Sequence, residues 1–273
     1  MNWMKYRWLY LLLSGSLIIF GIFSMLNWGF KVGIDFTGGS LLEYRVPNGD
    51  IKTFKGGFMD QSQKEKIKSD LENEVGENVT EIRFENVGPM IGPETIKKTM
   101  YALLISTAAI LLWIAYQFKN LKFGISATLA TIHDSLIVIG SFSILGHFFG
   151  AEIDFLFVTA VLTILSFSVH DTIVVFDRIR EKRKGRVGDL SEFADMAISE
   201  TMVRSINNSF TIIFMLLALI LLGGDTIRWF ATALLIGTIS GTYSSPFVAV
   251  SILVTWNELE KRFKKKQKGS SGF

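Results

Sequence analysis

The feature that most constrains this chain is a set of six long apolar runs. They lie near residues 8–28, 99–118, 123–147, 154–177, 208–223 and 228–256. A helix of about 20 apolar residues crosses the roughly 30 Å hydrocarbon core of a bilayer and satisfies its own backbone hydrogen bonds. With 49% hydrophobic residues and a mean hydropathy of +0.37, the chain is too apolar for an ordinary soluble domain. The sequence predicts a bundle of six transmembrane helices.

The first apolar run has a basic start, as a signal peptide has, but it continues to Trp28 and no small-x-small cleavage site follows. We therefore expect a retained anchor. Positive charge in the short loops predicts the orientation, because Lys and Arg concentrate in cytoplasmic loops. Basic residues lie before the first run, between the second and third, after the fourth and in the tail: Lys5, Arg7, Lys119, Lys122, 178–186 and 260–268. The loop at 146–155 has neither Lys nor Arg, so both termini are predicted to be cytoplasmic.

A polar region, residues 30–98, lies between the first two runs and is extracytoplasmic in this orientation. Alternating apolar residues predict strands at 40–46 and 79–87, and apolar residues at helical spacing behind an Asp60 cap predict a helix at 60–75. Residues 47–58 are rich in turn-forming types. The predicted fold is a membrane all-α bundle of six helices with a small extracytoplasmic α+β domain. Its divisions are 1–29, 30–98, 99–260 and a basic cytoplasmic tail, 261–273.

Two further features belong to the predicted bundle. An amphipathic cytoplasmic helix is expected near 190–206, in the loop before the fifth span, and Arg204 stands at its end. The last span carries a ridge of small residues at intervals of four, which allows another helix to approach closely. The ridge consists of Ala233, Gly237, Gly241 and Ser245.

The most unusual residues are ionisable groups inside the apolar runs. Asp171, preceded by His170, lies roughly 9 Å inside the predicted cytoplasmic end of the fourth span. A charged Asp at the bilayer centre costs about 2.5 to 3.5 kcal/mol, so it must face the bundle interior, water or a cation, or be protonated. Arg204 is a candidate cation for Asp171. These requirements predict a group whose protonation responds to its surroundings.

The third span repeats this arrangement, because His133 and Asp134 precede a Ser and an apolar run in the same way. Two such pairs favour a hydrated, proton-bearing seam between helices. The alternative is that both pairs hydrogen-bond neighbouring helices and fix their register without moving a proton.

The chain lacks the residues and motifs that several kinds of chemistry require. The chain has no cysteine, which excludes disulfides and thiolate sites. It has no G-x-x-x-x-G-K-[ST] phosphate loop and no H-E-x-x-H zinc motif. A net charge of +3, with the basic residues beside the apolar runs, does not favour nucleic-acid binding. We expect no enzyme activity, no metal and no cofactor other than a coupling proton.

Five stretches together resemble the SecF family of bacterial protein-export subunits, in order and over nearly the whole chain. They are "VGIDFTGGSLLEYRV", "ENVGPMIGPE", "HDSLIVIGSFS", "VHDTIVVFDRIRE" and "TMVRSINNSFTI". SecF belongs to the resistance–nodulation–division superfamily. The resemblance implies a partner, SecD, with six further spans, action at the SecYEG channel on preproteins, a possible association with YajC, and a place in the bacterial plasma membrane.

The resemblance also implies roles for individual residues. Asp171 matches the proton-carrying aspartate of the family, and Arg204 matches an arginine of the same relay. Asp35, Gly38 and Gly39 match a motif that follows the first span, where a glycine turn leading into the strand at 40–46 explains them as well as substrate contact does. In the implied mechanism, protonation of Asp171 weakens its attraction to Arg204, the bundle repacks and the outer domain shifts.

Three other functions stay open at this point. A proton-coupled exporter of a lipid or small hydrophobic molecule would also use intramembrane carboxylates. An intramembrane aspartyl protease would pair Asp134 with Asp171, which by residue count differ in depth by roughly 8 Å. A passive assembly subunit would tolerate the loss of Asp171 but would need the small-residue ridge.

Overall fold

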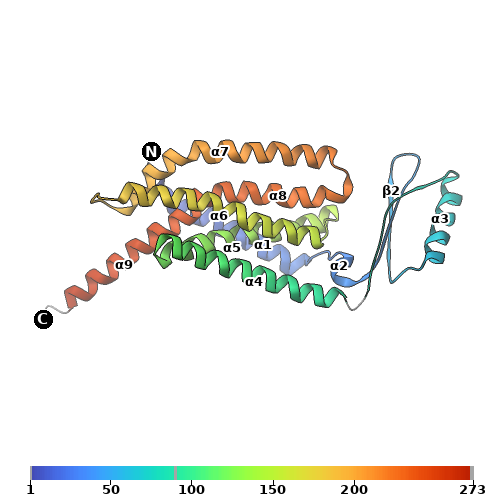
Figure 1. Cartoon of the computed structure of the whole chain (residues 1–273), viewed down its shortest axis with the longest axis horizontal. Helices are drawn as coiled ribbons and strands as arrows, with labels where there is room; N and C mark the ends of the chain where they lie inside the picture. The colour runs from blue at the N-terminus through green and yellow to red at the C-terminus, as the bar shows by residue number, and fades with distance from the viewer. Residues whose placement is uncertain (1, 89–90, 271–273) are drawn as a thin grey trace. The chain divides into compact units, whose positions relative to one another are not determined.

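The computed structural model describes residues 2–88 and 91–270 and divides into two compact units (Figure 1). The first unit is helical and comprises Met1–Lys31, Leu103–Glu152 and Leu156–Phe273. The second unit contains the sheet and comprises Val32–Ala102 and Ile153–Phe155. Long helices α4 and α6 therefore begin in the second unit and continue into the first.

The helical unit is built from long apolar helices. Their bounds are η1 Trp3–Tyr6, α1 Arg7–Trp28, α4 Ile91–Phe118, α5 Leu121–Phe149, α6 Phe155–Arg183, α7 Leu190–Leu222, α8 Asp225–Ser244, the π-helical η2 Ser245–Ala249, and α9 Val250–Ser270. Within the described part of the chain, six helical stretches are long and apolar enough to cross a membrane, counting α8, η2 and α9 as one. These stretches lie where the sequence predicts spans.

The amphipathic helix expected near 190–206 is present, but it does not end before the fifth apolar run. Helix α7 runs without a break from Leu190 to Leu222, so that segment and the fifth apolar run are one helix. No Pro or Gly interrupts residues 190–222, and the backbone hydrogen-bond ladder therefore continues. The predicted apolar stripe is nevertheless buried: Leu190, Phe193, Ala194, Ala197 and Ile198 all join the core of the bundle.

The last apolar run extends beyond its predicted limits and changes its geometry in the middle. A π-helical turn follows α8 and contains Pro246, which has no backbone N–H to donate. The small-residue ridge brings α8 against α6, because a Cβ added to Gly237 would lie 2.3 Å from Cδ1 of Ile164. Helices α1 and α5 approach in the same way, since a Cβ added to Gly140 would lie 2.7 Å from Cα of Gly21.

One end of the helical unit is held by ion pairs, and we call it the basic end. Arg7 at the start of α1 binds Glu258 of α9 at 2.5 Å, and Lys122 at the start of α5 binds Glu260. Just before α7, Asp189 accepts from Lys261 at 2.7 Å. Aromatic rings of α4, α5 and α6 fill the core next to this end: Phe118, Phe123 and Phe176, with centroids 5.1 to 6.1 Å apart. The ion pairs hold the first residues of α1 and α5 against the C-terminal half of α9.

The second unit is a small sheet with one helix. Its elements are α2 Ile34–Thr37, β1 Gly39–Arg45, β2 Ile51–Gly56, α3 Gln61–Val75 and β3 Thr80–Val87. The strand order is β2-β1-β3, and both pairings are antiparallel. The core is made of Leu42, Tyr44, Val46, Leu71 and Val79. The α+β region and the helix and two strands predicted for it are therefore present.

Strand β2 was not predicted, and it lies within the stretch 47–58 that the sequence marks as rich in turn-forming residues. Residues 47–50 make the turn of a hairpin, and Ile51–Gly56 pairs with Ser40–Arg45 of β1. The strand lies at the sheet edge and carries Lys52 and Lys55, so its sequence lacks the alternating apolar residues of a half-buried strand. Helix α3 begins as predicted, with Asp60 and Gln63 forming a reciprocal capping box.

Candidate functional site

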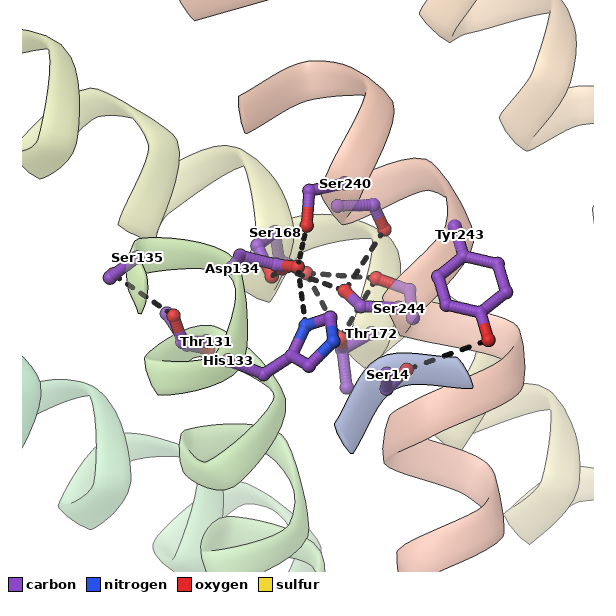
Figure 2. Close-up of polar contacts among 12 residues, drawn as sticks. Ser14, Thr131, His133, Asp134, Ser135, Ser168, Thr172, Ser240, Tyr243 and Ser244 are labelled. Atoms are coloured by element: carbon purple, nitrogen blue, oxygen red, sulfur yellow. Dashed lines mark hydrogen bonds and ion pairs between the residues drawn. The ribbon is translucent and has the colours of Figure 1, made fainter. Parts of the chain in front are cut away.

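The carboxylate of Asp134 on α5 is fully buried, with an exposure of 0% (Figure 2). Its Oδ2 accepts hydrogen bonds from the hydroxyls of Ser168 and Ser244, both at 2.6 Å. Its Oδ1 accepts from Ser240 at 2.6 Å and contacts Nδ1 of His133 at 3.1 Å. A carboxylate has about four acceptor positions, so Asp134 is saturated.

The partners of Asp134 come from three helices. His133 precedes it on α5, Ser168 lies on α6, and Ser240 and Ser244 are one turn apart on α8. Gly241 lies between the two serines, and a Cβ placed there would lie 3.5 Å from Ser168 and 3.7 Å from Oδ2 of Asp134. The small-residue ridge thus lets α8 come close enough for its serines to bind the carboxylate. Hydrogen bonds donated to a carboxylate favour its charged form.

A second layer of hydroxyls continues towards the basic end. Thr172 Oγ1 and Ser245 Oγ are 3.0 Å apart, and Ser245 also donates to the backbone carbonyl of Ser168 at 3.2 Å. Ser245 is the first residue of the π-helical turn. The change of helix geometry there points the Ser245 side chain towards α6, on the side of Asp134 that is nearer the basic end. Polar side chains therefore line the interface between α5, α6 and α8, and the hydrated, proton-bearing seam stays a prediction.

Asp171 of α6 has a different environment. It is partly exposed, and its one side-chain hydrogen bond in the described residues comes from Ser205 of α7, at 2.7 Å. A cavity of about 30 Å³ adjoins it, lined among others by His170, Asn208 and Thr238. That volume equals the share of one water molecule in liquid water. Asp171 therefore keeps free acceptor positions and has space for water beside it.

The pairing expected between Asp171 and Arg204 does not occur in this structure. Arg204 is exposed, and within the described ranges its side chain makes no hydrogen bond or ion pair. Because residues 190–222 form one continuous helix, Ser205 faces Asp171 and Arg204, one residue earlier, is rotated by about 100°. His170 is also exposed. The two His-Asp pairs that look alike in sequence are thus unlike in structure.

The two carboxylates lie closer in depth than residue counting predicted. Asp134 binds Ser168, and Asp171 follows Ser168 by three residues, so their levels differ by about 4.5 Å along the helix axis instead of roughly 8 Å. They still share no proton, because both oxygens of Asp134 are occupied by other donors and Asp171 binds α7. The geometry does not form the carboxylate dyad of an aspartyl protease.

Sequence reasoning did not single out Ser205, Ser240 and Ser244, which bind the two carboxylates. A signal was available for two of them, since Ser240 and Ser244 are spaced by four and flank Gly241 of the ridge. Ser205 had no comparable signal, because its role depends on the unbroken course of α7.

The motif around Asp35 forms a junction in the second unit. Oδ2 of Asp35 accepts from the backbone N–H of Phe155 at 2.8 Å, and Gly33 N–H donates to Ile153 at 2.9 Å. Phe155 is the first residue of α6, where a carboxylate satisfies a free N–H group and complements the helix dipole. Gly38 and Gly39 have φ of 72° and 111°, and a Cβ at Gly39 would lie 2.4 Å from the carbonyl oxygen of Gly56. These contacts account for the motif as a structural turn.

Groups of three or more His, Asp or Glu placed to hold a metal ion are not found in the part of the chain that the structure describes. The arrangement can instead do two things chemically. Asp134 holds three helices together through charged hydrogen bonds, and Asp171 offers a carboxylate with spare acceptor positions beside a water-sized space. The fold and these groups define a multi-pass membrane protein with carboxylates inside its helical bundle.

Comparison with known proteins gives the family. Residues 67–259 match the family model of the protein export membrane protein SecD/SecF, C-terminal. The chain is 39% identical to the protein translocase subunit SecF of Thermobaculum terrenum, over 92% of each chain. It is 36% identical to the SecF subunit of Anaerolinea thermophila, over 99% of each chain. The chain belongs to the SecD/SecF family and is similar to its SecF members.

Solved structures agree with this family. The chain is similar to SecDF of Thermus thermophilus, a translocon-associated membrane protein, with a TM-score of 0.85 and 29% identity over 94% of this chain. A second SecDF crystal structure, in a form called super-membrane-facing, has a TM-score of 0.73 and 29% identity over the whole chain. The chain spans 39% and 40% of the lengths of those two SecDF chains.

Proposed function

We propose that this protein is a SecF-type subunit that works with a SecD partner and uses the proton gradient to help preproteins through SecYEG. The family match and the similarity to SecDF support the export role. The observation that carries the proton coupling is the contrast in hydrogen bonding, since Asp171 has one donor and a water-sized space where Asp134 has four partners.

Asp171 is the proton carrier in this proposal. A carboxylate inside a bundle changes the packing around it when it gains or loses charge, because the charged form must be paired or hydrated. The single donor of Asp171, Ser205, belongs to α7, and part of α7 lies beside α8 (Figure 1). Protonation of Asp171 would weaken this bond and allow α7 to shift against α6.

Arg204 enters the relay only after a rearrangement. Its side chain is exposed on α7, one residue before the donor to Asp171, and a rotation of α7 by about one residue would exchange the two. His170 and His133 belong to the proposed relay as neighbours of the two carboxylates. Asp134 is its fixed anion.

The energy available sets how the cycle works. One proton that crosses 100 mV provides about 2.3 kcal/mol, while a nearly complete two-state change requires about 5.5 kcal/mol. One proton therefore biases the bundle and does not switch it fully. More than one proton for each cycle, an added pH gradient, or two states of similar free energy would complete the change.

The partner would cover apolar surface that the chain leaves exposed. Most of the residues of α1, α4 and α7 in the spanning stretches are not buried within the structure. The SecDF chains are more than twice as long as this one. In this proposal the partner supplies the part that this chain lacks, and its helices pack on these exposed faces. Lipid of the bacterial plasma membrane would cover the remainder, with both termini in the cytoplasm as the loop charges predict. A contact with YajC is part of the same proposal.

The test is preprotein export in vesicles that contain SecYEG, the SecD partner and this chain. We expect Asp171→Asn to abolish the gain that a proton gradient gives and to leave assembly intact. Asp70→Asn, the same change on the exposed face of α3, should behave as the unchanged protein does. Full proton-dependent export with Asp171→Asn would refute the proposal.

A further inference from the structure

The buried histidine beside Asp134 has one nitrogen that the carboxylate site does not use. His133 is 4% exposed, and its Nδ1 lies 3.1 Å from Oδ1 of Asp134. Because a charged carboxylate only accepts hydrogen bonds, Nδ1 carries a proton and donates it to Asp134. This assigns the tautomer, and the lone pair of the neutral ring is on Nε2.

The Nε2 atom of His133 is buried and has no hydrogen-bond partner among the described residues. It is one of seven buried polar side-chain atoms in the described residues that lack a partner, and among them it is the one that can take up a proton near neutral pH. The imidazole is fixed at its other nitrogen, which means that it cannot turn to satisfy Nε2 without giving up Asp134. The nitrogen is therefore held ready to accept a proton.

The register of α1 on α5 places Ser14 at the level of His133. Gly21 touches Gly140, and Ser24 donates to Ser143 at 2.9 Å, so the two helices run in parallel with a constant offset. Seven residues, or about two turns, nearer the basic end the same offset pairs Ser14 with His133. Ser14 is 3% exposed, and Figure 2 shows it on the side of the imidazole away from Ser135.

Ser14 does not stand alone. Its Oγ lies 3.5 Å from the hydroxyl of Tyr243 on α8 (Figure 2). That hydroxyl donates to the backbone carbonyl of Tyr10 at 3.0 Å. At 3.5 Å the bond from Ser14 to Tyr243 is long and weak. The Ser14 hydroxyl can therefore turn and accept from a new N–H group while Tyr243 stays in place. The pair leads from His133 towards the basic end.

We propose that His133 is a second proton-binding group of the bundle and that Nε2 is the atom that takes the proton. The product is an imidazolium paired with charged Asp134, with its new N–H donated to Ser14. One N–H bond forms at Nε2, and the proton comes from water and returns to water through the Ser14 and Tyr243 hydroxyls, each of which gives up one proton as it takes another. Asp134 stays charged throughout, because four hydrogen-bonding partners already occupy its acceptor positions.

The charged and titratable groups around His133 are few. On its own helix the nearest is Asp134, and α8 contributes Tyr243. Helix α6 and the π-helical turn contribute hydroxyls: Ser168, Thr172 and Ser245. Helix α1 carries Arg7 about two turns nearer the basic end, where Glu258 neutralises it. Of the groups named here, Asp134 is the one that places a full charge next to the imidazole. Its negative charge favours the imidazolium form of His133.

This inference rests on the proposed function, since it adds a second proton to a cycle for which one is too few. The site differs from that of Asp171 in its residues and in its route. The carboxylate of Asp171 lies at the cavity beside α7. The proposed proton route of His133 instead passes Ser14 of α1 and Tyr243 of α8. Proton binding at His133 can be measured without export, so the two proposals fail separately.

The test is nitrogen NMR of the full chain in lipid membranes, with ¹⁵N in its three histidines. The signal that disappears from the spectrum of the His133→Gln variant is assigned to His133. We expect Nε2 of His133 to become protonated as the pH falls from about 8 to about 5, the range in which imidazoles titrate. Its proton affinity should fall about tenfold in Asp134→Asn, and Ser14→Ala with Tyr243→Phe should slow the exchange of the new N–H with water.

Ser205→Ala is the matched control, because it removes the donor to Asp171 and should leave the His133 signal unchanged. An Nε2 that stays unprotonated throughout in the unchanged protein would overturn the inference, and this result needs no variant to fold. Equal proton affinity in folded Asp134→Asn would also overturn it. Protonation of His133 combined with normal export by Asp171→Asn would refute the proposed function and leave the proton site intact.

Discussion

The two aspartates of the bundle have similar sequence neighbours and opposite surroundings. Asp134 is fully buried and accepts from three serines on two neighbouring helices, while Asp171 is partly exposed and accepts from one serine. A carboxylate with every acceptor position filled resists protonation and holds helices together. A carboxylate with one donor and space for water can change its charge at low cost. The hydrogen bonds of Asp134 join three helices, whereas those of Asp171 leave it open to the coupling role proposed above.

The largest expected effect on stability is that of removing Asp134. Asp134→Ala leaves three buried serine hydroxyls and His133 without their acceptor, and we expect the bundle to lose roughly 2 to 4 kcal/mol. Thermal unfolding in detergent, followed by the loss of native Trp fluorescence, measures this. Asp171→Ala is the comparison, and an equal loss for both variants would remove the distinction between the two sites.

Next is the contact that brings α8 to the carboxylate. Gly237→Ala places a methyl group against Ile164, and we expect a loss of about 1 to 3 kcal/mol from the forced displacement. Gly15→Ala is the matched control, since a Cβ there meets nothing within 4 Å. Ile164→Ala in the Gly237→Ala background should restore part of the stability. Equal unfolding temperatures for the two single glycine variants would show that the close approach is not needed.

A smaller effect is expected at Asp171 itself. Asp171→Asn keeps a group that can accept from Ser205, so the unfolding free energy should change by less than about 1 kcal/mol. The coupling should disappear nevertheless, which separates stability from function. Thermal unfolding and export measured on one preparation test both halves. Unfolding as severe as that of Asp134→Ala would place Asp171 among the structural groups.

The smallest effect concerns an aspartate outside the membrane. The backbone N–H of Gln63 lowers the pKa of Asp60 below its ordinary value. Because the pKa of Asp60 is lower in the folded than in the unfolded state, the cap stabilises α3 at any pH above the unfolded pKa. This stabilisation is lost as the pH falls through the folded pKa, below about 4. The protection of the first-turn amides of α3 against hydrogen exchange, relative to their intrinsic rates, should therefore fall in acid. Asp60→Ala should show low protection at every pH, and an unchanged loss of protection in acid in that variant would contradict the assignment.

Much of the bundle could be predicted because it follows from local rules. The apolar runs are long enough to span a bilayer whatever lies beside them, and Asp60 caps α3 through its own backbone. Strand β2 was missed because an edge strand with Lys52 and Lys55 does not show an alternating pattern. The continuity of α7 was missed because a loop was placed where no residue interrupts the helix.

Residue patterns alone predict that this chain crosses a membrane, that it has a small α+β unit, and that two aspartates lie within apolar helices. Hydropathy and helical periodicity are properties of short segments, which is why they can be read without the fold. The packing of the helices determines which aspartate has its acceptor positions filled and which has a single donor. The donors Ser168, Ser205, Ser240 and Ser244 come from other helices, and the rotation and approach of those helices depend on packing at Gly237 and Gly241.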